Sequence, residues 1–224
     1  MNISVAIDGP AAAGKSTIAK RVASILNYTY IDTGAMYRAY TWYCLEHGID
    51  CNDEEASCAV IPDVKIEFGE GNKVFCNGND VTFAIREPRI NINVSPIATY
   101  KRVRLALVEL QRQMARNTSV IMDGRDIGTY VLPDAQVKIF QIASVETRAL
   151  RRYKENQEKG IPGTLDEIRA DVIRRDYVDS HRAFAPLKPA EDSIELDTSD
   201  LTIDQVVDAV LKIIDNKLKE FKNE

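Results

Sequence analysis

The chain has 224 residues, of which 45% are hydrophobic and 28% charged, a composition typical of a soluble globular protein. Its formal net charge of -5 gives no electrostatic reason to expect a nucleic acid or an anionic membrane as a partner. Four cysteines without a CxxC pair, beside only two histidines, argue against a zinc site and a disulfide framework. No signal-peptide pattern and no membrane-length apolar run is present, so we expect a cytoplasmic protein, with a monomer as the default.

The first element is a short apolar strand, Ile3–Ile7, followed by the sequence DGPAAAGKST and then by a helical pattern. Gly9, Gly14, Lys15 and Ser16 fit G-x-x-x-x-G-K-[ST], the pattern of a phosphate-binding loop. Glycine lets backbone N–H groups approach phosphate oxygens, and Lys15 adds a mobile ammonium. Ser16 would place its hydroxyl on a Mg²⁺ ion that bridges the nucleotide phosphates. This order of strand, loop and helix predicts a nucleotide-binding site.

The elements that follow alternate between strand and helix patterns, which favours an α/β fold around a parallel sheet. Residues 28–32 are predicted as the second strand. The next helix should present one face made by Met36, Tyr40, Tyr43 and His47. Residues 62–82 alternate apolar and polar positions between Gly- and Asn-rich turns, which predicts an inserted antiparallel subdomain of two or three strands.

The second half of the chain continues the α/β pattern. A helix is expected with one face made by Val103, Leu107, Leu110 and Met114. Strands are predicted at 119–122, 137–142 and 193–197, with a charged helix to about Lys159 after the second of them. Thr164 with Glu167, and Thr202 with Gln205, have the spacing of helix caps. The final helix should bury Ile203, Val207, Val210 and Ile214.

Several arginines lie near the predicted strand ends and in loops. They help to distinguish a switch, a motor and a transferase, all of which bind nucleotides through such a loop. They are Arg38, Arg125, Arg174, Arg175 and Arg182. An arginine fork binds phosphate through two hydrogen bonds, and several forks together can neutralise a donor and an acceptor phosphate. The N-K-x-D signature of a regulatory GTPase is absent from the sequence. The pattern therefore favours a phosphotransferase.

Five segments of the chain resemble bacterial cytidylate kinases. They are AIDGPAAAGKST (6–17), YIDTGAMYR (30–38), MDGRDIGT (122–129), VKIF (137–140) and DSHRAFAPL (179–187). The antiparallel stretch at 62–82 also resembles the insert of this family. The resemblance implies one P-loop kinase domain over 1–224, with a monophosphate-binding region at 33–98 and a short lid at 148–163. Some members have a further arginine where this chain has Val178.

The resemblance implies a reaction of ATP with CMP or dCMP in the presence of Mg²⁺. The ATP contacts it implies are Gly9, Pro10, Ala11, Ala12, Ala13, Gly14, Lys15, Ser16, Thr17 and Arg148. The CMP contacts it implies are Thr33, Tyr37, Arg38, Ser95, Arg104, Arg125, Asp126, Arg175, Asp179 and Arg182. Lys15, Arg125 and Arg182 would stabilise charge on the transferred group, and Ser16 would be the metal ligand.

Cytosine recognition has a physical basis in this set. Cytosine offers acceptors at O2 and N3 and a donor at its amine, so an arginine donor and an aspartate acceptor complement it. Ser95, Arg104 and Asp126 would provide these groups, and UMP would leave them unpaired. Two alternatives stay open at this point, a kinase for another acceptor such as UMP, AMP or a shikimate-like compound, and a nucleotide-dependent regulatory ATPase.

Overall fold

The computed structural model describes residues 2–158 and 160–223. The chain divides into two compact units. The first unit is made by residues 1–30 and 117–224, and the second unit by residues 31–116. No helix within the described ranges is both long and apolar enough to cross a membrane.

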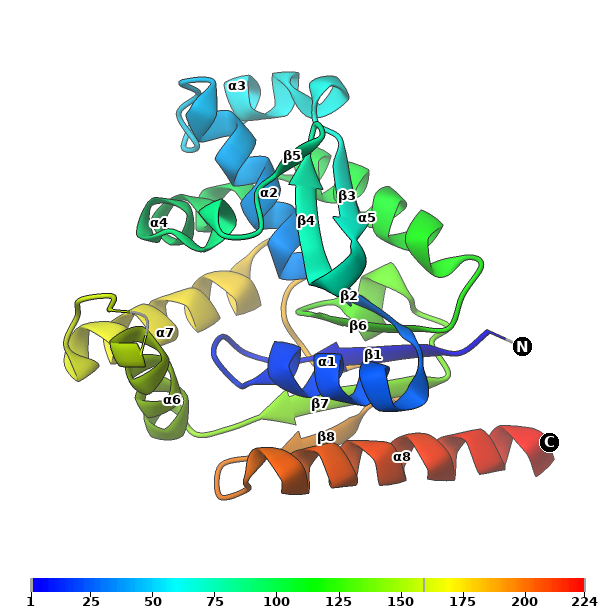
Figure 1. Ribbon diagram of the computed structural model, residues 1–224. Coiled ribbons are helices and arrows are strands. Elements are labelled where there is room, and N and C mark those ends of the chain that lie inside the picture. Colours follow the sequence, from blue (N-terminus) through cyan, green and yellow to red (C-terminus); the bar gives the residue numbers. More distant parts are fainter. Residues whose placement is uncertain (1, 159, 224) are drawn as a thin grey trace. The chain divides into compact units, whose positions relative to one another are not determined.

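A five-stranded sheet with the order β2-β6-β1-β7-β8 organises the first unit (Figure 1). Its strands are β1 (Ser4–Asp8), β2 (Thr29–Asp32), β6 (Val120–Gly124), β7 (Val137–Ile142) and β8 (Ile194–Asp197). Strand β1 pairs in parallel with β6 and β7, and β7 pairs in parallel with β8. Asp8, the last residue of β1, is in register with Gly124 and Phe140. The loops that follow β1 and β6 therefore start at the same edge of the sheet, where ligands of open α/β sheets bind.

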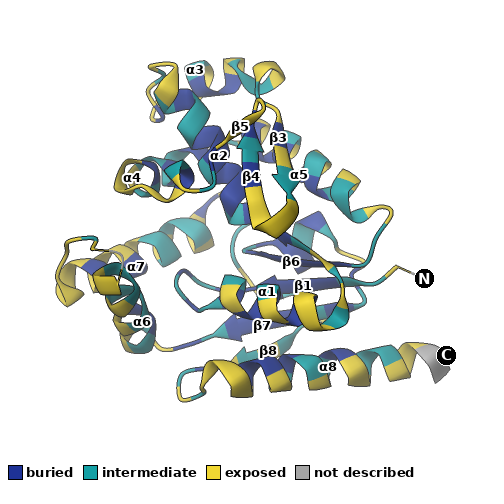
Figure 2. Cartoon of the chain, in the orientation of Figure 1, coloured by how far each residue is buried: buried dark blue, intermediate teal, exposed yellow. Residues whose placement is uncertain are grey.

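Two helices, α1 (Lys15–Leu26) and α8 (Ile203–Asn223), lie side by side against β1, β6 and β7 (Figure 1). Their contact with the strands forms the core, in which Ile7, Val22, Ile139 and Val210 are at most 1% exposed. The dark buried stripe along each helix in Figure 2 is the face that meets this core. Helices α6 (Val145–Glu158) and α7 (Leu165–His181) pack against each other, and a single π-helical turn, η4 (Ile127–Val131), follows β6.

The second unit combines helices with a small antiparallel sheet of order β3-β4-β5. The strands are β3 (Ile66–Gly69), β4 (Lys73–Cys76) and β5 (Asn79–Asp80). The helices are α2 (Thr33–Glu46), α3 (Glu54–Ala59), α4 (Pro88–Ile97) and α5 (Lys101–Ala115). Three single turns complete the unit, η1 (Ile61–Asp63), η2 (Glu70–Asn72) and η3 (Ala84–Arg86). Helix α2 is buried nearly all round because it contacts α4, α5, β3 and β4.

The predicted fold class, a parallel α/β sheet with an antiparallel insert, is confirmed, and so are both predicted caps. One face assignment is wrong. Ile203 lies in the first turn of α8, where it is 52% exposed, and Val206 is buried instead. His47 follows Glu46, the last residue of α2, and its ring stacks on Tyr43, as expected for two residues on one face of the helix. Lys159, where the charged helix was expected to end, lies outside the described residues.

Candidate active site

The phosphate loop runs from Gly9 to the first turn of α1 and depends on glycine at both ends. Gly9 has a φ of 151°, and a Cβ there would lie 2.0 Å from the carbonyl oxygen of Gln141. Gly14 caps α1 with a φ of 87°, in the left-handed region where a side chain is unfavourable. No acidic side chain lies in the first turn of α1, so its N–H groups and partial positive charge face only the loop. This geometry suits an anionic phosphate.

Lys15 is the first residue of α1 and is 5% exposed. Its Nζ donates to the carbonyl oxygen of Pro10 at 2.7 Å, so the ammonium lies back across the loop. Burial, and after it the positive charge of Arg125, lower the pKa of Lys15 to about 7. A buried cation whose charge is this costly would be stabilised by a bound anion.

Ser16 and Asp123 place two side-chain oxygens next to each other, and oxygen is the ligand type that Mg²⁺ prefers. The Ser16 hydroxyl donates to Asp123 Oδ2 at 2.8 Å, and the Tyr30 hydroxyl donates to Asp123 Oδ1 at 2.7 Å. Because Mg²⁺ takes one or two protein ligands and completes its shell with substrate phosphates and water, this donor set fits it. Sequence reasoning missed Asp123, although its place at the end of the buried strand β6 was a usable signal.

Asp8 was also missed, and it joins the phosphate loop to the loop after β6. Its carboxylate accepts from the N–H groups of Ile127 at 2.8 Å and Gly128 at 2.7 Å. Burial raises the pKa of Asp8 to about 6, against the effect of these two hydrogen bonds. Asp8 therefore fixes the segment that carries Arg125 and Asp126.

Arg125, Asp126, Asp179 and Arg182 form an ion-pair cluster in the first unit. Arg125 Nε donates to Asp179 Oδ2 at 2.7 Å, and Arg182 Nη2 donates to Asp126 Oδ1 at 3.1 Å. Burial disfavours the charge of Arg125, but the carboxylates around it, Asp179 above all, together outweigh this cost and raise the pKa of Arg125. Asp179 has a lowered pKa because these arginine charges exceed its cost of burial.

For Arg175 the nearby carboxylates of Asp179 and Asp171 do not outweigh the cost of burial. Burial lowers its pKa to about 10, and the nearby charge of Arg125 contributes to the decrease. Lys15, Arg151 and Arg175 are thus three cations of the first unit whose pKa values are lowered, in each case mainly by burial.

Arg148 lies in α6 and is 4% exposed. Its guanidinium donates to the carbonyl oxygens of Ala143 and Ala11, both at 2.9 Å, and to Asp176 at 2.6 Å. This predicted ATP contact therefore touches the phosphate loop directly. Asp176 was not predicted as a site residue.

The second unit holds the remaining predicted residues on three helices. Thr33 and Tyr37 are buried in α2, and Ser95 is half-buried in α4. Arg104, in α5, is 1% exposed, donates to the carbonyl oxygen of Ala98 at 3.0 Å and lies over the ring of Tyr37, 5.4 Å from its centroid. Stacking and a backbone hydrogen bond thus orient this guanidinium.

Arg38 is positioned by an acidic cap. Asp32 caps α2 by accepting from the N–H of Ala35 at 2.8 Å, and it also pairs with Arg38 Nη2 at 3.3 Å. Arg86 approaches the same carboxylate at 3.7 Å. The Nε of Arg38 is buried and has no hydrogen-bond partner among the described residues. This buried donor is suited to an acceptor oxygen from a ligand.

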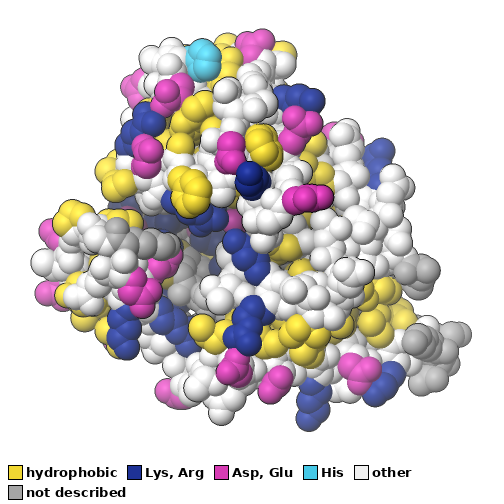
Figure 3. All heavy atoms as spheres, viewed as in Figure 1, with side chains coloured by type: hydrophobic (Ala, Val, Ile, Leu, Met, Phe, Trp, Pro, Cys, Tyr) yellow, Lys and Arg dark blue, Asp and Glu magenta, His cyan; other side chains and the backbone are white. Residues whose placement is uncertain are grey.

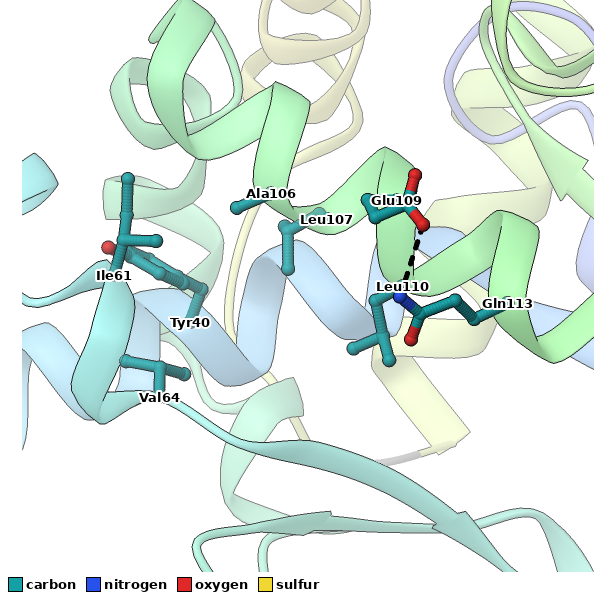
Figure 4. Close-up of a pocket in the computed structure, with 8 residues that line it drawn as sticks. All are labelled: Tyr40, Ile61, Val64, Ala106, Leu107, Glu109, Leu110 and Gln113. Carbon is teal, nitrogen blue, oxygen red and sulfur yellow. Dashed lines mark hydrogen bonds between the residues drawn. The ribbon is translucent and has the colours of Figure 1, made fainter.

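A cavity of about 240 Å³ also lies in the second unit, and Figure 4 shows the side chains around it. Its lining is made by Tyr40, Ile61, Val64, Ala106, Leu107, Glu109, Leu110 and Gln113. The two polar residues of the rim, Glu109 and Gln113, bond each other at 3.1 Å. None of the predicted site residues lines this cavity, so it is separate from the candidate chemistry.

Sequence comparison decides the family. The family model described as cytidylate kinase matches residues 5–216. This chain belongs to the cytidylate kinase family. The cytidylate kinase of Anoxybacillus flavithermus is 51% identical over 97% of this chain and 98% of that protein. The cytidylate kinase of Lactobacillus gasseri is 55% identical over 96% of this chain and 95% of that protein.

Solved structures support the fold at greater distance. An uncharacterised protein from Eubacterium ventriosum matches with a TM-score of 0.53 at 13% identity, over 96% of this chain and 99% of its own. A gluconokinase from Sinorhizobium meliloti matches with a TM-score of 0.52 at 9% identity, over 99% of this chain and 97% of its own. The family places this chain among the nucleoside monophosphate kinases, and the prediction of a CMP kinase is confirmed at that level.

Proposed function

We propose that this chain transfers the γ-phosphoryl group of ATP to CMP or dCMP, with Mg²⁺, by direct in-line displacement. One observation carries the donor side of the proposal. The phosphate loop contains a buried cation, Lys15, whose pKa is lowered to about 7 and whose Nζ donates to the loop carbonyl of Pro10. Phosphate oxygens would supply the negative charge that this side chain lacks.

The donor phosphates bind along residues 9–17 in this proposal. The loop N–H groups contact the phosphate oxygens, and Lys15 leaves the Pro10 carbonyl to pair with them. Ser16 and Asp123 are the metal ligands. When bound, Mg²⁺ neutralises the developing charge and orients the phosphates. The segment 148–163 acts as a short lid that excludes water, with Arg148 as its ATP contact.

The acceptor is bound by the region 33–98 together with later residues. The buried Nε of Arg38, and the guanidiniums of Arg125 and Arg182, take the CMP phosphate. Arg175 and Asp179 contact the ribose. Thr33 and Tyr37 lie in the helix that carries Arg38, and they line the same nucleotide.

The base is read by Ser95, Arg104 and Asp126. Arg104 donates to the cytosine O2 and N3 acceptors, and Asp126 accepts from the amine. The stacking of Arg104 on Tyr37 supports this assignment because it fixes a buried donor in one orientation. UMP, which carries N3–H and O4, would leave both groups mispaired.

No protein nucleophile takes part, since an ionised phosphate oxygen of CMP can attack directly. Lys15, Arg125 and Arg182 stabilise the charge on the phosphoryl group during its transfer, and the protein contributes mainly by positioning the two substrates.

The test is the formation of ADP from Mg-ATP with CMP, dCMP, UMP, AMP or no acceptor. ADP formed only with CMP or dCMP, together with the matching diphosphate, is the expected result. Equal ADP with and without acceptor would identify an ATPase and overturn the proposal. A preference for UMP would overturn the assignment of Arg104 and Asp126.

A further inference from the structure

One residue of the phosphate loop, Ala11, has both its backbone N–H and its carbonyl bound by side chains of distant helices. The N–H of Ala11 donates to Asp176 Oδ1 at 3.0 Å, and its carbonyl accepts from Arg148 at 2.9 Å. Asp176 Oδ2 and Arg148 are themselves paired at 2.6 Å. We call this closed set of three residues the Ala11 clamp.

The backbone next to the clamp needs external support. Ala12 has a φ of 57°, in the left-handed region that a residue with a Cβ adopts unfavourably. Such a conformation persists where surrounding contacts determine it. The clamp fixes the residue before Ala12, and the Gln141 amide fixes the residue after it by donating to the Ala13 carbonyl at 2.6 Å.

The clamp is sheltered from water, which strengthens its ionic hydrogen bonds. The Arg148 side chain is 5% exposed and the Asp176 side chain 23%. Arg148 also donates to the neutral carbonyl of Ala143, and Asp176 supplies the negative charge that pairs with its guanidinium. Its removal would leave a buried guanidinium without that charge, beside a loop that has lost one of its hydrogen bonds.

We propose that Asp176 is a positioning residue for the phosphate donor, which fixes both the phosphate loop and Arg148 while the nucleotide binds. The inference rests on the proposed function and adds a residue to it. Asp179, one turn later in α7, makes the corresponding contact to Arg125 at 2.7 Å. The two carboxylates therefore serve different substrates, Asp176 the donor and Asp179 the acceptor.

The experiment compares Asp176→Asn, Asp176→Ala and Asp179→Asn by steady-state kinetics and by direct titration with Mg-ATP. Asp176→Asn keeps an acceptor for the Ala11 N–H but removes the charge opposite Arg148. We expect it to raise KM for ATP about tenfold, the effect of one ionic hydrogen bond, and to leave KM for CMP within about twofold. Asp176→Ala should raise KM for ATP further, and Asp179→Asn should raise KM for CMP instead.

Two controls separate positioning from general damage. Asp204→Asn removes an exposed ion pair with Arg21, 2.7 Å long and outside the site, and should leave both KM values unchanged. When Arg148→Met is already present, Asp176→Asn should raise KM for ATP much less than it does alone, because the partner of Asp176 is gone.

Either of two results would overturn the inference. They are an unchanged KM and dissociation constant for ATP in Asp176→Asn, and an equal rise in the KM values of both substrates. If the unaltered protein forms no CDP, the proposed function fails, and the Mg-ATP titration still decides the role of Asp176 on its own.

Discussion

The two units hold their site residues by different means. In the first unit, charged side chains are tied to loops through contacts that span the chain, and Lys15 and Arg175 have lowered pKa values. In the second unit, Arg38 and Arg104 are oriented by near neighbours, a helix cap six residues away and a carbonyl six residues away. The first arrangement pairs cations with carboxylates from remote segments, whereas the second fixes the direction of individual donors.

This difference predicts a division of labour. Loss of a phosphate-binding cation of the first unit, such as Lys15, should reduce the rate of transfer with every acceptor, because charge on the phosphoryl group is common to all of them. Changes among the base-reading residues should alter the choice of acceptor. Acidic and basic side chains are interspersed over the face shown in Figure 3. This face therefore offers no extended patch of one charge to attract a nucleotide, and the local contacts of the site residues must hold it.

The largest effect is expected for Lys15→Met. Loss of the ammonium should lower kcat about a thousandfold with both CMP and UMP, the range found for a charge that stabilises a transferring phosphoryl group. The thermal midpoint should not fall, since a buried charge with a lowered pKa is removed. A variant with near-normal kcat would break the assignment of phosphate binding to this loop.

Arg104→Met should have the next largest effect, and it should act on specificity. Methionine keeps part of the packing on Tyr37 but donates no hydrogen bond. We expect kcat/KM for CMP to fall about a hundredfold and kcat/KM for UMP to change little, because the lost donors match cytosine only. An equal loss with both acceptors would show that Arg104 has a general structural role.

Asp126→Asn tests which unit reads the amine of the base. Asp126 belongs to the first unit and pairs with Arg182 at 3.1 Å, so it could act through charge alone. We expect the ratio of kcat/KM for CMP over UMP to fall about tenfold, as one mispaired hydrogen bond would give. An unchanged ratio with a lower kcat would show that Asp126 acts by orienting Arg182, and that only residues of the second unit recognise the base.

The fold and the phosphate loop could be predicted because their signals are local. The phosphate loop is one continuous motif. In the antiparallel insert, apolar and polar residues alternate over about twenty residues, in contrast to the helical spacing on either side. The capping pairs, three residues apart, were equally readable. The face assignment of Ile203 failed because this residue continues the helical spacing into the first turn of α8, where it is exposed.

The side chains that hold the backbone of the site loops could not be predicted, since their hydrogen-bond partners are remote in sequence. Asp8 bonds an N–H 120 residues away, Gln141 bonds a carbonyl 128 residues away, and Asp176 bonds an N–H 165 residues away. No spacing rule connects such positions. Asp123 was within reach, because an aspartate that ends a buried strand next to a phosphate loop is a candidate metal ligand.

The smallest predicted effect is a pH dependence confined to the first unit. The pKa of Lys15 is about 7 in the folded protein and 10.5 ordinarily. Above pH 7 the ligand-free protein loses the ammonium, and bound phosphates must restore the proton. Affinity for Mg-ATP should therefore fall several-fold per pH unit above 7, with proton uptake on binding. Titration calorimetry in two buffers of different ionisation enthalpy counts that proton.

Stability should change in the opposite direction over the same range. Between pH 7 and 10.5 the unfolded chain keeps a proton on Lys15 that the folded chain has released, so this residue makes the fold more stable as pH rises. Lys15→Met should abolish both the proton uptake and this part of the stability profile. Affinity of CMP alone should keep its pH profile in that variant if Lys15 serves only the donor. A shift in the pH profile of CMP binding would show that the charge of Lys15 acts on both substrates. The two units would then differ in how they bind the base, and not in how they bind the acceptor phosphate.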